Sequence, residues 1–183
     1  MKKLFLFVIC ASLFIGCKKE AAMGTATTTT TADGTASVPP VEFADAKYTE
    51  IGKKSLGAMT SGDMDAWMSN YADNAKYYWN SGDSLVGKPA IDKYWRDRRV
   101  NLIETITFAK DIWLPIKVNE KGNIPVEGYW LLSWYQVTAK YKGGGTMTQW
   151  IHTSFHFDVN DKIDMVNQYV DMAAIKAALP KTK

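Results

Sequence analysis

The chain has 183 residues, of which 46% are hydrophobic and 22% are charged, and this balance excludes a wholly disordered protein. A formal net charge of +3 is too small to indicate nucleic-acid binding on its own. Two cysteines and two histidines exclude a disulfide-rich scaffold and a histidine-rich metal site. The unusual feature is the aromatic content of 13%, which includes 7 Trp and 9 Tyr.

The N-terminus has the pattern of a bacterial export signal. Two lysines precede an apolar stretch over residues 4–15, which is shorter than the roughly 20 residues that span a bilayer. The stretch runs into Leu-Phe-Ile-Gly-Cys at residues 13–17. This resembles the lipobox of bacterial lipoproteins, although Phe14 is bulkier than usual at its position. We expect residues 1–17 to be a lipoprotein signal peptide ending at a lipidated Cys17, with an ordinary cleaved signal as the alternative.

A spacer follows the signal peptide. Residues 18–42 are rich in Thr, Ala and Gly and contain few large apolar side chains, so they cannot bury enough surface to order themselves. We expect a disordered tether that joins Cys17 to a folded domain over residues 43–183. The lipid would anchor the protein to the membrane without spanning it. Because no Asp follows Cys17, we expect the outer membrane of the bacterial cell envelope.

The first half of the domain has helical spacing. Residues 44–61 predict a helix that ends at Gly62, since glycine readily adopts the left-handed conformation of a helix end. Asp63 is a good N-cap for a second helix, in which apolar residues recur at i, i+3, i+4 and i+7 up to Tyr71. A short aromatic strand over 75–80 is predicted next. A third helix then starts at residue 88, with a proline in its first turn.

After residue 99 the apolar period changes from about four to two, which is typical of strands. The predicted strands span 102–114, 126–142, 146–159 and 162–169, with a glycine hairpin at 143–145 and a terminal helix over 171–179. The first of these strands is predicted to be bent. The order predicts an α+β fold with three N-terminal helices packed in a curved antiparallel sheet.

Three motifs carry a resemblance to a known family. They are Ser-Gly-Asp-Met-Asp-Ala-Trp at 61–67, Tyr-Ala-Asp-Asn-Ala at 71–75 and Gly-Lys-Pro-Ala-Ile at 87–91. In this order, between these predicted elements, they resemble the nuclear transport factor 2-like superfamily. That superfamily includes ketosteroid isomerase and SnoaL-like polyketide cyclases. The resemblance covers 43–183 and implies a cone-shaped roll whose mouth holds a mostly apolar ligand.

The resemblance also tests for isomerase chemistry, which needs a carboxylate base and two acidic hydrogen-bond donors. The base position of ketosteroid isomerase falls on Trp79, and its two donor positions fall near Ser55 and Thr153. None of these side chains can perform the corresponding role. Ketosteroid isomerase activity is therefore not expected.

Other catalytic assignments are weak. Asp111 in the bent strand could serve a SnoaL-like enzyme, but an aspartate on the solvent face of a strand is the simpler interpretation. Epoxide-hydrolase relatives pair arginine with carboxylates in the pocket, and the run Arg-Asp-Arg-Arg at 96–99 offers these residue types. At a helix end, such a run is more typical of a solvated surface. A cysteine nucleophile is excluded, because no Cys follows Cys17.

No metal or cofactor site is expected. His152 and His156 lie four residues apart in a predicted strand, which separates them by roughly 13 Å, whereas zinc ligands lie within about 2.1 Å of the ion. We expect both histidines to be exposed or to contact a second protomer. The acidic and basic residues are interspersed, so no nucleic-acid partner is expected either.

The aromatic residues instead indicate a ligand cavity. Alternation along the strand 146–159 places its most apolar face toward the interior of the cone. Neighbouring strands and the third helix add further inward positions. The expected ligand-binding residues are Trp79, Tyr94, Trp95, Tyr135, Val137, Thr153 and Phe155. The same rings could instead fill the cone as core, and the two outcomes are evenly balanced.

Three functions follow from this. The first is a tethered, non-catalytic binding domain for a small apolar or amphipathic molecule, without a cofactor. The second is a SnoaL-like cyclase, isomerase or hydrolase whose acid–base residues are not placed by the motifs. The third is a homodimer or protein-interaction module that uses the outer face of the sheet, where Trp130, Trp134 and Trp150 are expected to be exposed.

Overall fold

The computed structural model describes residues 38–123 and 126–181. The signal peptide, Cys17 and most of the tether lie outside these residues, so lipidation and anchoring stay predictions. Seven strands form one sheet in the order β1-β4-β5-β6-β7-β2-β3. The strands are β1 (Val41–Phe43), β2 (Tyr71–Trp79), β3 (Ser84–Val86), β4 (Ile103–Val118), β5 (Gly128–Tyr141), β6 (Thr146–Phe157) and β7 (Ile163–Tyr169).

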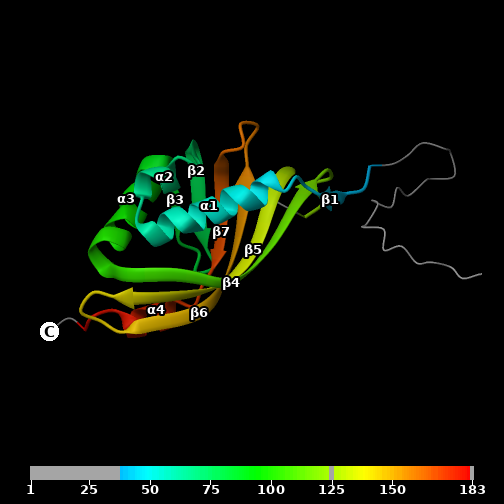
Figure 1. The fold of residues 1–183 in the computed structure, drawn as a ribbon. Helices are drawn as coiled ribbons and strands as arrows, with labels where there is room; N and C mark the ends of the chain where they lie inside the picture. Colours follow the sequence, from blue (N-terminus) through cyan, green and yellow to red (C-terminus); the bar gives the residue numbers. More distant parts are fainter. Residues whose placement is uncertain (1–37, 124–125, 182–183) are drawn as a thin grey trace, which may run out of the picture.

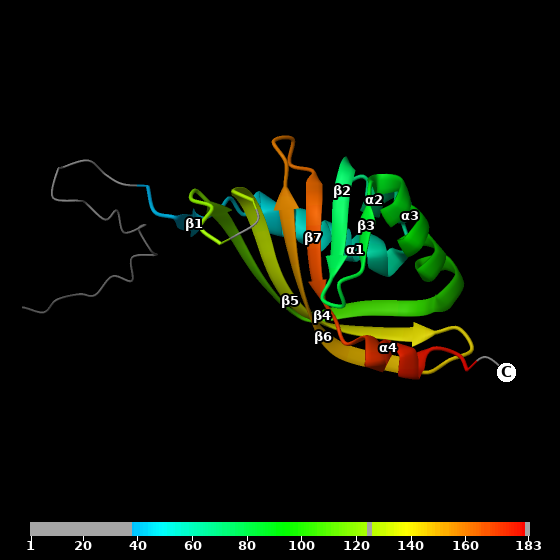
Figure 2. The same cartoon turned by 180° about the vertical axis from the view of Figure 1, so that it is seen from behind.

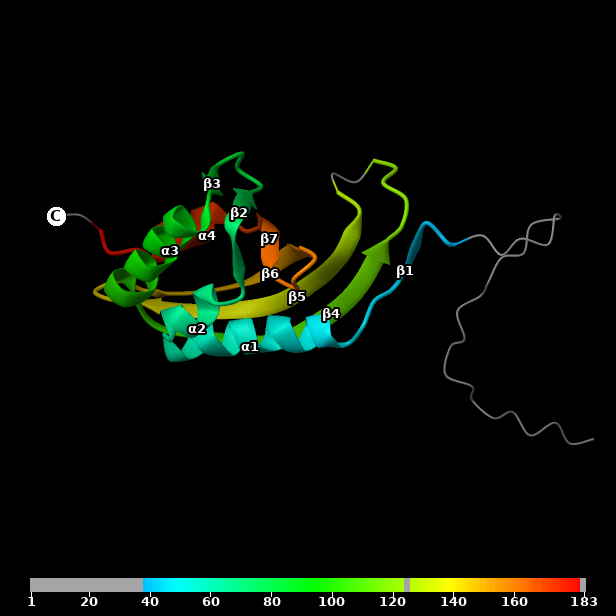
Figure 3. The same cartoon turned by 90° about the horizontal axis from the view of Figure 1, so that it is seen from above.

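The sheet curls around its helices (Figures 1 and 2). The helices are α1 (Lys47–Ser61), α2 (Met64–Met68), α3 (Lys88–Asp97) and α4 (Met172–Ala178), and a π-helical turn over Arg98–Leu102 continues α3. Seen from above, α1 runs along the sheet and α3 lies beyond the end of α1 (Figure 3). Among the described residues, no helix is long and apolar enough to cross a bilayer.

The predicted meander is confirmed, because β4, β5, β6 and β7 pair antiparallel in chain order. The bend in β4 is also confirmed. It lies at Lys110, which has φ 55°, and the register with β5 shifts between Ala109 and Ile112. The other neighbour of β7 is β2, and these two strands run parallel. The roll is therefore an α+β fold with a curved, largely antiparallel sheet.

The predicted helix ends are confirmed by their capping geometry. Gly62 has φ 82° at the end of α1, a conformation in which a side chain would be strained. The carboxylate of Asp63 accepts a hydrogen bond from the backbone N–H of Ala66 at 2.9 Å, so Asp63 caps α2. Pro89 lies in the first turn of α3, and Asp171 caps α4 through the N–H of Ala173.

One predicted boundary is wrong. The second helix ends at Met68, and Tyr71 begins β2 instead of completing the helix, so this strand starts four residues before the predicted position. Tyr71 already pairs with Ile163 of β7, so the chain is part of the sheet from this residue onward. Tyr71 is still buried against Trp67, with ring centroids 4.8 Å apart. The apolar spacing located the right side chain but assigned it to the wrong element.

Two short strands were not predicted. The strand β3 pairs with β2 at one edge of the sheet. The strand β1 pairs with β4 at the opposite edge, with Val41 facing Val118. Folded backbone thus begins two residues before residue 43, where the domain was expected to start.

One end of the sheet is filled with rings, and we call it the filled end. Tyr48 of α1 lies between Tyr129 and Phe157, with ring centroids 4.9 Å and 4.6 Å apart. Trp130 completes this end on the other side of the sheet, where it is 4% exposed and donates its indole N–H to the carbonyl of Val126. The prediction that Trp130 is exposed is therefore wrong, because the segment before β5 covers it.

His156 also belongs to the filled end, and the prediction that it is exposed is wrong. It is 6% exposed. Its Nδ1 lies 2.5 Å from a carboxylate oxygen of Asp164, and its Nε2 lies 2.9 Å from the carbonyl oxygen of Glu127. These contacts attach the segment before β5 to β6 and β7. His156 is a structural residue here.

Candidate functional site

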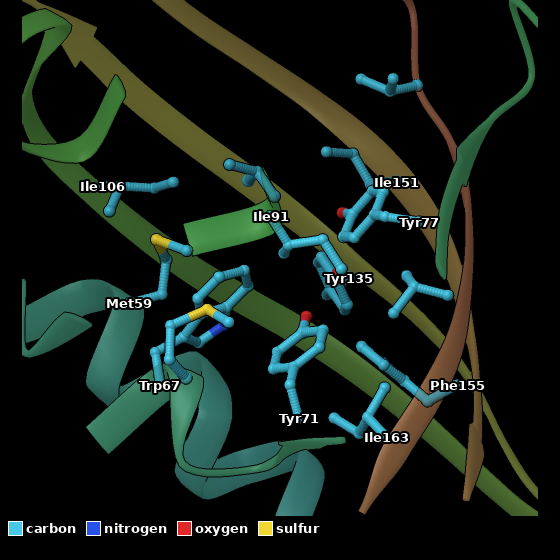
Figure 4. Close-up of a cluster of buried hydrophobic side chains, with 14 of the residues drawn as sticks. Met59, Trp67, Tyr71, Tyr77, Ile91, Ile106, Tyr135, Ile151, Phe155 and Ile163 are labelled. Atoms are coloured by element: carbon cyan, nitrogen blue, oxygen red, sulfur yellow. The ribbon is translucent and has the colours of Figure 1, made fainter. Parts of the chain in front are cut away.

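The opposite end of the sheet, which we call the hollow end, surrounds a cavity of about 290 Å³. This volume lies near the lower end of the range of roughly 300–1,000 Å³ that is typical of small-molecule sites. The walls come from α1, α2, α3, the π-helical turn and α4 on the helical side and from β2, β4, β5, β6 and β7 on the sheet side. Figure 4 shows part of this wall, with Met59, Ile106, Tyr135 and Phe155 among the labelled side chains. The rings therefore line the cone without filling it.

The structure places every predicted ligand-binding residue in this wall. These residues are Trp79, Tyr94, Trp95, Tyr135, Val137, Thr153 and Phe155. Two hydrogen bonds orient the polar members. The Trp79 indole donates to the side-chain oxygen of Gln168 at 3.1 Å, and the hydroxyls of Tyr135 and Thr153 lie 2.7 Å apart. The residues are brought together as predicted, and their contact with a ligand stays a prediction.

The three positions that correspond to the isomerase site also line the cavity. They are Ser55 on α1, Trp79 on β2 and Thr153 on β6. Their location supports the alignment on which the resemblance rests. In the described part of the chain, no Asp, Glu, His or Cys lines the cavity. The wall therefore lacks the side chains that usually take up a proton near neutral pH.

Buried tyrosines are the main polar groups of the wall. Burial raises the pKa of the Tyr71 and Tyr77 hydroxyls well above the ordinary value of 10.0. Burial also raises the pKa of Tyr135 to about 12, although hydrogen bonds with Thr153 and Gln168 act in the opposite direction. These phenols remain protonated at neutral pH. They can donate a hydrogen bond to a ligand, but they cannot serve as bases there.

Arg98 is a cavity residue that the sequence analysis missed. The run 96–99 was predicted to be a solvated surface, but its three arginines have separate contacts. Arg96 pairs with Asp92 and Asp65 outside the cavity, and Arg99 donates to two backbone carbonyls at the end of α1. Arg98 lines the cavity with its Cζ 3.6 Å from the ring centroid of Tyr94. Arg98 lies four residues after Tyr94, and side chains at i and i+4 of a helix are neighbours, so this spacing could have predicted the contact.

The terminal helix supplies another part of the wall that was not predicted. Met172, Ile175, Lys176 and Leu179 line the cavity from α4 and the residue after it. The glycine turn at 143–145 allows this helix to dock. The N–H of Gly145 donates to the carbonyl of Ala178 at 2.8 Å, and a Cβ on Gly144 would lie 2.5 Å from the same oxygen. Sequence periodicity cannot locate such a contact between two distant segments.

The remaining chemical candidates lie outside the cavity wall. Asp111 is exposed at the bend of β4, where the indole N–H of Trp113 donates to it and lowers its pKa. His152 is half-buried beside Trp134, and its Nδ1 lies 2.9 Å from the carbonyl oxygen of Ser133. Within residues 38–123 and 126–181, no three His, Cys, Asp or Glu side chains are grouped so as to hold a metal ion.

Neither a family model nor a curated protein matches the sequence. Solved structures do share its fold. A candidate polyketide cyclase from Pseudomonas putida aligns with a TM-score of 0.60 at 16% identity, covering 72% of this chain and 97% of that one. An LEH-like epoxide hydrolase from M. tuberculosis aligns with a TM-score of 0.57 at 13% identity, covering 73% and 90%.

A third structure comes from Catenulispora acidiphila and is described as having a ketosteroid isomerase-like fold, in complex with trimethylamine. It aligns with a TM-score of 0.53 at 16% identity and covers 70% of this chain and 91% of that one. At these identities the similarity establishes the architecture alone. The chain has the nuclear transport factor 2-like fold that is also found in SnoaL-like and ketosteroid isomerase-like proteins.

Proposed function

We propose that this protein is a lipid-anchored protein of the bacterial cell envelope that binds a small apolar or amphipathic molecule without transforming it. The observation that carries the proposal is an open cavity of about 290 Å³ whose wall is mainly aromatic and aliphatic and, within the described residues, contains no Asp, Glu, His or Cys. Transfer of a ligand's apolar surface from water into such a wall contributes roughly 25 cal/mol per Å².

The similarity to enzymes is the basis of the alternative function. Structures with this fold include proteins described as a candidate polyketide cyclase and an epoxide hydrolase. The phenols of Tyr71, Tyr77 and Tyr135 could polarise a carbonyl group of a bound molecule, since burial keeps them protonated. A cyclase or isomerase also needs a base near the reacting carbon. The described wall offers no Asp, Glu, His or Cys for this role, which favours binding over catalysis.

Native mass spectrometry of the full-length protein, purified from its own envelope, tests the binding function. We expect an added mass that is lost on denaturation. The variant Val137→Phe places extra volume in the cavity wall, and we expect it to lose the bound mass. Thr138→Phe, on the adjacent residue of β5 and the opposite face, is the matched control. A wild-type protein that carries no ligand and takes up no small apolar molecule would contradict the proposal.

The anchor is tested separately, because Cys17 lies outside the described residues. We expect the wild-type protein to sediment with the outer membrane and Cys17→Ser to lose its lipid modification. An unmodified wild-type protein would contradict the anchor and leave the cavity function unaffected.

We further propose that two copies associate through the outer face of the sheet. A row of side chains crosses four strands there, from Ile112 through Trp134 and His152 to Tyr169. Ile112 and Tyr169 are each more than half exposed, and Trp150 beside them is 50% exposed. An apolar surface of this kind is typical of an interface. Analytical ultracentrifugation should detect a dimer that Trp150→Glu weakens, and a wild-type monomer at all concentrations would contradict this association.

A further inference from the structure

We propose that the ligand of the cavity is an apolar monocarboxylate whose charged head binds Arg98. This inference rests on the proposed binding function and specifies its ligand class. It depends on three observations: the position of Arg98, the charge of the cavity wall, and the apolar depth behind it.

The first observation is that Arg98 lies at the cavity wall over an aromatic ring. Its Cζ lies 3.6 Å from the ring centroid of Tyr94, which is a stacking distance. A guanidinium carries five N–H donors, so contact with one tyrosine leaves further donors for a ligand. Two of these donors match the two oxygens of a carboxylate. Tyr94 thus positions Arg98 and leaves it able to bind an anion.

The second observation is the unbalanced charge of the wall. Arg98 and Lys176 are its cations, and no carboxylate lines the cavity in the described part of the chain. Some cations outside the cavity have acidic partners, as Arg96 has in Asp65 and Lys140 in Glu104. Among the ion pairs between described residues, none includes Arg98 or Lys176. The cavity is therefore electropositive where these two side chains lie, and an anion would supply the missing partner.

The charge of Arg98 also acts on the hydroxyls of Tyr94 and Tyr141. Burial raises the pKa of Tyr94 and of Tyr141, and in both cases Arg98 opposes this rise. The two phenols remain protonated near neutral pH and can donate to the same anion. Arg98 is half-buried, so its interaction with a ligand is less screened by water than that of a surface arginine.

The third observation is the apolar wall behind this polar group. Ile103, Ile106, Val137 and Ile151 line the cavity from β4, β5 and β6. A ligand with one anionic head and an apolar body can pair its head with Arg98 and place its body against these aliphatic side chains. A dianion would leave its second charge against aliphatic side chains, which is costly without a partner. The volume of about 290 Å³ restricts the body to a short chain or a single ring.

The test compares two probes that share an apolar body and differ in charge, 4-phenylbutyrate and 4-phenylbutanol. Each is titrated by isothermal calorimetry into the full-length protein in a non-ionic detergent, with detergent alone as the blank. We expect the carboxylate to bind about tenfold more tightly than the alcohol, because a hydrogen-bonded charge pair adds to the shared apolar contact. Added salt should weaken binding of the carboxylate and leave the alcohol unchanged.

Variants then assign the preference to Arg98. Arg98→Gln should reduce carboxylate binding about tenfold and leave alcohol binding within about twofold, whereas Arg98→Lys should retain a preference for the anion. Lys176 is exposed, so Lys176→Gln should reduce carboxylate binding only about twofold. Arg96→Gln is the matched control, because it removes the same charge from α3 outside the cavity.

The outcomes separate the two proposals. Equal affinity of the wild-type protein for both probes, or a preference that survives in Arg98→Gln, would overturn the carboxylate inference and leave a neutral-ligand cavity. Failure of the wild-type protein to bind either probe would also overturn the carboxylate inference, whereas the binding function fails only if the purified protein carries no ligand and takes up no small apolar molecule.

Discussion

The filled end and the hollow end belong to the same sheet, and the same alternation of side chains runs through both. At the filled end, Tyr48 of α1 contacts the rings of Phe157 and Tyr129 directly. At the hollow end, two turns further along α1, Ser55 faces the sheet and a cavity of about 290 Å³ lies between them. The size of the helical side chain opposite the sheet therefore determines whether the cone is filled.

Gly52 separates the two ends on α1. A Cβ at this position would lie 2.6 Å from Leu131 Cδ2 and 2.7 Å from Trp113 Cζ3, so the helix is in direct contact with the sheet here. Tyr48, Gly52 and Ser55 thus present a large ring, no side chain and a small hydroxymethyl group to the interior in turn. Along α1, this close contact lies between Tyr48 at the filled end and the cavity-lining Ser55.

The largest expected effect is at the filled end. Phe157 is 2% exposed and packs on Tyr48, so Phe157→Ala should lower the free energy of unfolding by about 3–5 kcal/mol. Phe155→Ala, two residues away on the same strand, removes a ring that already borders the cavity. We expect a smaller loss there, about 2–3 kcal/mol, together with weaker ligand binding. Urea denaturation measures both, and equal losses with unchanged binding would contradict the distinction between the two ends.

The next effect is a loss of stability in alkali that originates at the hollow end. The folded-state pKa of Tyr135 is about 12, against an ordinary value of 10.0. Above about pH 10 the unfolded chain releases this proton while the folded chain retains it, so stability falls as pH rises. The full effect of Tyr135 approaches about 3 kcal/mol. Tyr135→Phe should flatten this part of the curve between about pH 10 and about pH 12. An unchanged slope would show that the pKa of the phenol is not raised by folding.

Much of the hollow end could be predicted from the sequence. Strand period placed Val137, Thr153 and Phe155 on the inner face, and that face is the cavity wall. Whether the cone was open depended on the space left by Ser55 and Gly52, which only a three-dimensional arrangement of α1 against β5 can reveal. Local patterns therefore identified the wall but did not determine its volume.

The errors have a common physical cause. Trp130 and His156 alternate with inward residues as predicted, yet both are buried because the segment around Val126 and Glu127 covers them. Arg98 belongs to a charged run that was predicted to be solvated, yet it stacks on Tyr94. Exposure depends on which distant segment covers a residue, and periodicity contains no information about that.

A third prediction tests the close contact that separates the two ends. Gly52→Ala inserts a methyl group against Leu131 and the rigid ring of Trp113, so we expect a loss of about 1–2 kcal/mol after the helix gains the higher propensity of alanine. Gly57→Ala is the matched control on the same helix, since nothing lies within 4 Å of its added Cβ. It should raise stability by about 0.5–1 kcal/mol. Opposite signs in thermal denaturation are the expected result, and a gain in both variants would contradict the contact.

The smallest expected effect concerns the edge of the filled end, where Asp161 accepts hydrogen bonds from Lys47 Nζ at 2.8 Å and from the hydroxyl of Tyr48 at 3.0 Å. The hydrogen bond from Lys47 lowers the pKa of Asp161 below its ordinary value of 3.8, with a further contribution from Tyr48 and an opposing one from burial. Because the folded pKa is the lower one, this contribution to stability is present above pH 3.8 and is lost as pH falls through the folded pKa.

Asp161→Asn isolates this contribution, since asparagine tolerates the φ of 59° at this position. The melting temperature of the variant should lie slightly below that of the wild-type protein near neutral pH and converge with it in strong acid. The difference should be small, because the side chain is 42% exposed and solvent screens the ion pair. Ligand binding at the hollow end should not change, since this contact lies beyond Gly52. A difference in melting temperature that stays the same at every pH would show that Asp161 does not hold Lys47 and Tyr48 at the filled end.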